Sequence, residues 1–101
     1  MELEKWQKLN IFEQLGNIGS EVSRARYFED KGEIKKRNSS LERSFDLLDL
    51  TLADRKNVGH SGEIGRLKEV LADIYSAAGN YSVALPDLEK MFFEYATVAR
   101  K

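Results

Sequence analysis

The chain has 101 residues, of which 42% are hydrophobic and 33% are charged, as in one small soluble domain spanning residues 1–101. Lys and Arg total 16 and Asp and Glu total 17, for a formal net charge of −1. We therefore do not expect bulk positive charge to hold a nucleic acid. The chain contains no cysteine, which excludes disulfides, thiolate catalysis and cysteine-ligated metals. No stretch approaches the ~20 apolar residues of a membrane helix, and residues 1–7 lack the apolar centre of a signal peptide, so we expect a cytoplasmic protein.

Glycine and proline divide the chain into segments with helical periodicity. Gly32, Gly59 and Gly79 each follow such a segment, and a glycine there supplies the left-handed residue that ends many helices. The single proline, Pro86, suits the first turn of a helix because the donor that it lacks would be unpaired there. We therefore expect helices over roughly residues 10–31, 33–55, 62–78 and 86–100.

The N-terminal third predicts a short arm followed by a long helix. Leu3, Trp6 and Leu9 keep helical spacing, which indicates either an extra turn or a docked arm. Asn10 and Glu13 then form a variant of the capping box and predict the start of the first long helix. The apolar positions of that helix recur at three- and four-residue steps: Ile11, Leu15, Ile18, Val22 and Ala25.

The other three segments also place their apolar residues on one face each. In the second these residues are Ile34, Leu41, Phe45, Leu48 and Leu52. In the third, with Ser61 as the expected N-cap, they are Ile64, Leu67, Leu71, Ile74 and Ala78. In the fourth they are Leu88, Met91, Phe92, Tyr95, Ala96 and Ala99. No segment alternates with a period of two, and short connections favour antiparallel neighbours. We therefore predict an all-α fold, an antiparallel up-down-up-down four-helix bundle.

Three stretches of the chain resemble a known group of proteins. Asn10–Ala25 (NIFEQLGNIGSEVSRA), Leu47–Asp54 (LLDLTLAD) and Arg66–Asp73 (RLKEVLAD) are similar to segments of a group of small, uncharacterised bacterial helical-bundle proteins. The resemblance spans most of the chain and implies a four-helix fold. It implies no activity, substrate or catalytic residue.

Two arginines interrupt the apolar faces. Arg26 falls about 20° from Leu15 on a helical wheel. Either its stem packs while the guanidinium reaches water, or it forms a buried or half-buried ion pair or an anion site. The candidate acidic partners are Asp46, Asp49 and Asp73. Arg37 lies similarly near the apolar face of the second helix, and we expect its guanidinium to reach water.

Small residues form a strip beside the apolar arc of the first helix: Gly16, Gly19, Ser20 and Ser23. Each glycine inside a helix costs about 1 kcal/mol relative to alanine, so two in one turn require a reason. Close approach of a neighbouring helix is the interpretation that we favour. The alternative is a groove around Gly16 and Ser20 that receives a ligand or a partner chain.

Several aromatic residues fall outside the predicted core. Phe93 lies on the far side of the fourth helix, and Trp6, Tyr27, Phe28 and Tyr81 lie outside the clearest apolar faces or at their margins. A surplus of aromatic residues in so short a chain predicts a docked N-terminal arm or a self-association surface. We therefore expect a homodimer, or a protein partner bound through these residues.

The residues that could carry catalysis do not form a convergent set. His60 is the single histidine, in a Gly-His-Ser-Gly turn. Arg55 and His60, with four residues between them, resemble the Rx4–6H motif of HEPN domains, helical bundles that include ribonucleases whose Arg and His contact the scissile phosphate. That motif lies on a helix facing a dimer cleft, whereas Gly59 and Gly62 predict a loop here. The serines have no suitably placed histidine partner.

A metal centre is not expected either. No predicted helix carries a histidine, which excludes a ferritin-like di-iron site. The carboxylates spread over the helices fall mostly on polar faces: Glu21, Asp46, Asp49, Glu69, Asp73 and Glu94. Arg66, Glu69 and Asp73 are typical of an exposed, charge-paired strip.

The sequence thus predicts no catalytic, cofactor-binding or metal-binding residue. It favours a non-enzymatic module that acts by protein–protein contact or self-association. One alternative is a HEPN-like ribonuclease or its inactive relative, using Arg55 and His60. The other is a bundle that binds a small ligand or an anion at the Gly16/Ser20 groove and Arg26.

Overall fold

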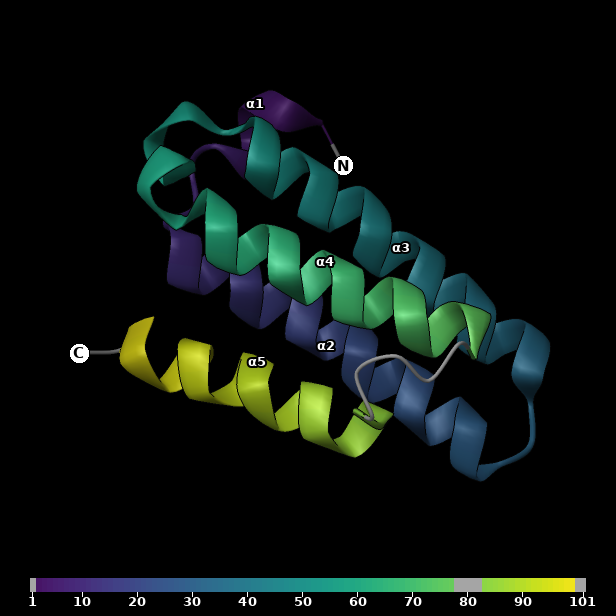
Figure 1. The fold of residues 1–101 in the computed structure, drawn as a ribbon. Coiled ribbons are helices and arrows are strands. Elements are labelled where there is room, and N and C mark those ends of the chain that lie inside the picture. Colours follow the sequence, from purple (N-terminus) through teal and green to yellow (C-terminus); the bar gives the residue numbers. More distant parts are fainter. Residues whose placement is uncertain (1, 78–82, 100–101) are drawn as a thin grey trace.

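A computed structural model describes residues 2–77 and 83–99, and every regular element within them is helical (Figure 1). The elements are α1 (Leu3–Trp6), α2 (Ile11–Asp30), α3 (Ile34–Ala53), the 3-10 helix η1 (Arg55–His60), α4 (Ser61–Ser76) and α5 (Leu85–Ala99). The four long helices α2, α3, α4 and α5 pack against one another, which confirms the all-α prediction. No helix among the described residues combines the length and apolarity needed to cross a membrane.

Helix α2 lies at the centre of the packing. It runs along α3 on one side and along α5 on the other, and α4 packs along α3 (Figure 1). The fully buried hydrophobic residues come from every long helix and from α1: Trp6, Leu15, Ile18, Val22, Ala25, Leu41, Leu48, Ile64, Leu67, Val70, Leu71, Leu85, Leu88 and Phe92. Two residues of the predicted α3 face are instead exposed, Ile34 (50%) and Leu52 (37%). They lie in the first and last turns of α3, where fewer neighbouring side chains cover a helix.

The two ends of α2 form as the sequence predicts. Asn10 Oδ1 accepts from Glu13 N at 2.8 Å, and Glu13 Oε1 accepts from Asn10 N at 3.0 Å, which completes the capping box. At the other end Gly32 adopts φ +72°, and Glu33 N donates to Phe28 O at 2.9 Å. This left-handed turn brings the chain into α3.

The segment between α3 and α4 differs from the predicted loop. Helix α3 ends at Ala53, and Asp54 caps a 3-10 helix that runs directly into α4. Asp54 Oδ1 accepts from Lys56 N at 3.2 Å, and the side chain of Asn57 is buried. The positions of the glycines alone do not predict the Asp54 hydrogen bond or the burial of Asn57. Ser61 is also not the N-cap of α4: it is the first helical residue, and its Oγ donates to Val58 O at 3.0 Å.

The end of α4 also differs from the prediction. The left-handed residue is Ala77, with φ +58°, directly after the last helical residue Ser76. Ala78 and Gly79, which were expected to end this helix, lie outside the described residues. A left-handed conformation costs an alanine about 1–2 kcal/mol that a glycine does not incur, so sequence alone does not favour a helix end there.

Candidate functional site

A solvent-open groove of about 620 Å³ lies between α2 and α5. Its lining combines two features that the sequence singled out separately, the small-residue strip of α2 and the exposed aromatic residue of α5. The lining residues are Asn10, Phe12, Glu13, Gly16, Asn17, Gly19, Ser20, Ser23, Phe92 and Phe93. This groove is the candidate functional site.

Gly19 sets the distance between the two helices that form the groove. A Cβ built on Gly19 would lie 2.6 Å from Phe92 Cβ, well inside the ~3.5–4.0 Å of normal carbon contacts. The close helix approach predicted for the strip is therefore confirmed at this position. The other strip residues, Gly16, Ser20 and Ser23, line the open groove. The small residues of α2 thus allow α5 to pack closely at Gly19 and leave a hollow between the two helices at the other positions.

A second, smaller hollow of about 310 Å³ continues along α2 from Ser23. It is lined by Ser23, Arg26, Tyr27, Asp30, Lys31 and Glu89. Because Ser23 lines both hollows, they form one furrow along the outer face of α2, with α5 as its second wall.

Arg26 forms an ion pair across this furrow, but with a different acid from those expected. Its Nη1 donates to Glu89 Oε1 of α5 at 2.7 Å, and its Nε lies 4.0 Å from Asp30 Oδ2. The Arg26 side chain is 42% exposed. Asp46, Asp49 and Asp73 are not its partners. They lie on α3 and α4, whereas the helix beside this face of α2 is α5. The hydrogen bond and charge of Glu89 raise the pKa of Arg26, against the effect of burial, and Asp30 adds to the increase.

Arg37 does not extend into water, contrary to the prediction. Its side chain is only 13% exposed. Nη2 donates to Ile74 O in the last turn of α4 at 3.3 Å, and Nε lies 3.2 Å from Glu29 Oε1 near the end of α2. A cation at a helix C-terminus complements the helix dipole. Arg37 therefore ties α3 to the ends of α2 and α4.

The predicted surplus of aromatic residues is smaller than expected. Tyr27 and Phe93 are 51% and 63% exposed, as predicted. Phe28 is half-buried and contacts Tyr27 edge to face. Trp6 is fully buried because α1 docks against α3. The prediction that Trp6 lies outside the core is therefore wrong. Tyr81 lies outside the described residues.

Arg55 and His60 do not form an assembled pair in the described structure. Both lie on η1, where about three residues per turn place positions five apart roughly 120° from each other. The described contact of His60 is with Glu63, with Nδ1 3.8 Å from Oε2, and the imidazole is 44% exposed. The motif lies on a helix, as the HEPN resemblance requires, but this helix is a 3-10 helix, whose geometry separates the two positions.

The carboxylates do not gather into a metal site among the described residues. Glu21 instead pairs with Arg24 at 3.0 Å and Arg43 at 2.9 Å. The predicted exposed strip on α4 is wrong at Asp73, whose side chain is buried. Asp46, Asp49, Glu69 and Glu94 are exposed.

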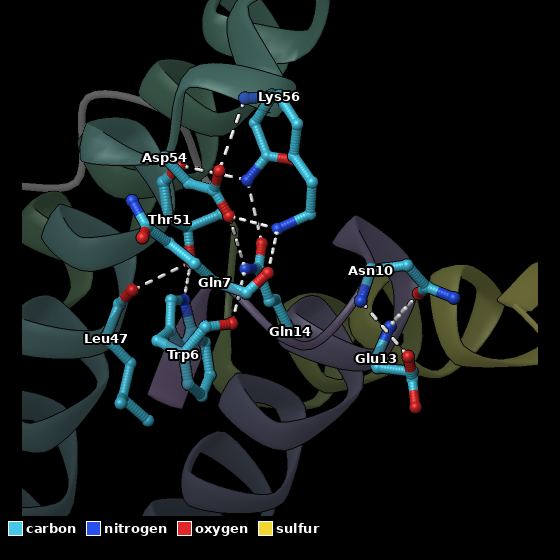
Figure 2. Close-up of polar contacts among 10 residues, drawn as sticks. Trp6, Gln7, Asn10, Glu13, Gln14, Leu47, Thr51, Asp54 and Lys56 are labelled. Carbon is cyan, nitrogen blue, oxygen red and sulfur yellow. Dashed lines mark hydrogen bonds and ion pairs between the residues drawn. The ribbon is translucent and has the colours of Figure 1, made fainter. Parts of the chain in front are cut away.

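Sequence reasoning missed a buried polar network at the end of the bundle beside α1 (Figure 2). Gln14 stands at its centre: Nε2 donates to Trp6 O and to Asp54 Oδ2, both at 2.9 Å, and Oε1 accepts from Asn57 Nδ2 at 2.7 Å. Trp6 Nε1 donates to Thr51 Oγ1 at 2.9 Å. These contacts hold α1, the first turn of α2, the last turn of α3 and η1 together.

Lys56 closes the network on its outer side. Its Nζ contacts Asp54 Oδ2 and donates to Gln7 O at 2.7 Å. Burial raises the pKa of Asp54, but hydrogen bonds from Lys56 and Gln14 and the charge of Lys56 outweigh it, so that this pKa lies below its usual value. The network fixes the start of α2 and with it the end of the groove near Asn10 and Glu13.

One signal for the network was present in the sequence. Gln14 lies eleven residues before Ala25, which places the two about 20° apart on a helical wheel. A glutamine at the edge of an apolar arc needs buried partners. Those partners come from residues far along the chain, and no local pattern names them.

Comparison of the chain with family models, with curated proteins and with solved structures yields no match. The resemblance to small bacterial helical-bundle proteins therefore stays a prediction.

Proposed function

We propose that this chain is a non-enzymatic helical-bundle module that acts by protein–protein contact, and that it self-associates through the furrow between α2 and α5. The observation that carries the proposal is the position of Phe93. It is 63% exposed, and it borders a hollow lined by Gly16 and Ser20. An exposed aromatic ring beside a hollow is a typical interface feature, because burying the ring removes apolar surface from water.

We also propose the antiparallel up-down-up-down order for the four long helices, and a cytoplasmic location. The short turn between α2 and α3, Lys31–Glu33, supports the helix order because it leaves the chain no room to cross the bundle. The location rests on composition alone.

Sedimentation velocity over a micromolar concentration series tests self-association. We expect a reversible monomer–dimer equilibrium for the unaltered chain. Phe93→Glu should shift it toward monomer by at least tenfold, since burying a carboxylate in an apolar contact is costly. Val58→Glu is the matched control, because Val58 is 76% exposed on η1, outside the furrow. It should associate like the unaltered chain.

Circular dichroism should show the same helix content and cooperative unfolding for both variants, because neither side chain belongs to the buried core. A chain that sediments as a monomer at every concentration would refute the proposal. So would a Phe93→Glu variant that dimerises as well as Val58→Glu.

A further inference from the structure

The outer face of α2 is nearly palindromic: aromatic and small residues follow one another in the same order whether the helix is followed from its N-terminus or from its C-terminus. Phe12, Gly16, Ser20, Ser23 and Tyr27 follow one another at steps of four, four, three and four. At ~100° per residue they fall within an arc of about 80°. All five line the two hollows of the furrow. The face therefore has an aromatic residue at each end and small residues between.

We propose that the occupant of the furrow is a second copy of this chain, docked with its α2 antiparallel to the first about a two-fold axis between Gly19 and Ser20. This inference rests on the proposed self-association and specifies its geometry. The two-fold places Phe12 of each copy opposite Tyr27 of the other, and Gly16 opposite Ser23. A two-fold interface uses the same patch on both copies, so the patch must be self-complementary. This face meets that requirement.

The small residues at the centre of the face permit the close helix approach that this arrangement needs. Gly16, Ser20 and Ser23 carry little or no side chain, so that two helix backbones can come near each other. The same helix already shows such an approach on its adjoining side, where Gly19 lies against Phe92 of α5. Larger residues would hold the copies apart.

The charges along the furrow are complementary under the same two-fold. Among the described residues that line the larger hollow, Glu13 carries the only charge. The smaller hollow at the other end is lined by Arg26 and Lys31 and by Asp30 and Glu89, and Arg24, which pairs with Glu21, follows Ser23 in the sequence. Antiparallel docking places Glu13 of one copy within a turn of Arg24 of the other, on the same edge of the face. A parallel arrangement would instead bring like ends together.

The exposed aromatic residues are also covered in this arrangement. Phe93 lines the larger hollow, and its neighbour Phe92 lies against Gly19, so that Phe93 stands close to the proposed axis. Phe93, 63% exposed, is then covered at the centre of the interface, and Tyr27, 51% exposed, is covered near Phe12 of the second copy. Each copy supplies one Phe93 and one Tyr27, so that the interface covers four exposed rings.

The available area suits a reversible dimer. A 20-residue helix is about 30 Å long, and two packed helices are about 20 Å wide. The α2–α5 face therefore offers roughly 600 Å² per copy, at the lower limit of the ~1,200–2,000 Å² that specific interfaces bury in total. We expect a micromolar dimer and not an obligate one.

Single-cysteine crosslinking tests the geometry, because the chain has no cysteine of its own. Ser20→Cys places a thiol beside the proposed axis, with its counterpart offset by about 1.5 Å along the helix. A disulfide requires Cα atoms within about 7 Å, so mild oxidation should yield a covalent dimer. Ser39→Cys is the matched control. Both serines are exposed on long helices and donate to the carbonyl four residues earlier, Gly16 O at 3.3 Å and Lys35 O at 3.1 Å.

Ser23→Cys distinguishes antiparallel from parallel docking. The two-fold offsets Ser23 from its counterpart by about seven residues, or roughly 10 Å, whereas parallel helices would place the two side by side. We expect the yield of covalent dimer at micromolar concentration to be at least tenfold higher for Ser20→Cys than for Ser23→Cys or Ser39→Cys.

Equal yields for Ser20→Cys and Ser39→Cys would overturn the inference, and a Ser23→Cys yield as high as that of Ser20→Cys would overturn the antiparallel order. The unaltered chain is sedimented in parallel. A dimer in sedimentation without the Ser20→Cys preference refutes this geometry but leaves the proposed function standing. A monomer in sedimentation refutes both.

Discussion

Replacing Gly19 with alanine tests how closely α2 and α5 approach each other. In a helix interior alanine is more favourable than glycine by about 1 kcal/mol. The added Cβ, however, would lie 2.6 Å from Phe92 Cβ, about 1 Å inside normal carbon–carbon contact. Because Phe92 Cβ is bonded directly to the α5 backbone, no change of rotamer relieves the clash. The whole of α5 must move.

Overpacking of this kind costs about 1–3 kcal/mol. The gain in helix propensity offsets part of this cost. We therefore expect Gly19→Ala to lower the free energy of unfolding by up to about 2 kcal/mol. Gly65→Ala is the matched control, because Gly65 lies inside α4 and a Cβ there would meet nothing within 4 Å. That variant should gain about 1 kcal/mol.

Thermal unfolding followed by circular dichroism measures both variants. For a domain of this size 1 kcal/mol corresponds to about 4–8 °C in Tm. We expect the two alanine substitutions to shift Tm in opposite directions. A Gly19→Ala variant stabilised as much as Gly65→Ala would refute the close approach of α2 and α5, and with it our account of the strip.

Three further predictions concern the polar contacts. Gln14→Leu should lower the free energy of unfolding by about 1–3 kcal/mol, measured in urea, because it leaves Asn57 Nδ2 and Trp6 O short of a buried partner; a neutral effect would contradict the network. Asp54→Asn should remove an acid-sensitive part of the stability. The lowered pKa of Asp54 means that its ionised form stabilises the fold above the unfolded value of about 3.9, and that this contribution is lost as pH falls through the lower folded value. Melting curves from pH 2 to 6 should therefore be flatter for the variant, and an unchanged pH dependence would oppose this assignment. Arg37→Met should keep the packing of the stem but lose about 1–3 kcal/mol in the same urea assay, since it removes a charged partner of Ile74 O and Glu29; unchanged stability would show that Arg37 does not tie the helix ends.

Local chemistry explains why much of the fold was predictable. The capping box of Asn10 and Glu13 and the left-handed Gly32 each act within a few residues, so they can be identified from the chain alone. The apolar faces follow from helical periodicity, and most of their members are buried as predicted. Ile34 and Leu52 are exceptions, because the position of a residue along its helix decides whether any neighbour covers it.

The candidate site was only half predictable. The small strip and the exposed Phe93 could each be recognised from the sequence, but not that they line one groove. Arg26 was identified as unusual, yet its partner is Glu89, 63 residues away along the chain. Periodicity reveals which face of a helix is apolar. It does not reveal which helix lies beside that face.

The composition is near-neutral, lacks cysteine and supplies enough apolar residues for a core. Those properties depend on residue types and local spacing, so the sequence by itself determined the all-helical class and the approximate helices. Tertiary structure decided what lies between the helices. It buried Trp6 by docking α1 against α3, gathered Gln14, Asp54 and Asn57 into one network, and placed Phe93 beside the small residues of α2. Each of these outcomes joins residues far apart in the chain, and no local rule specifies such pairs.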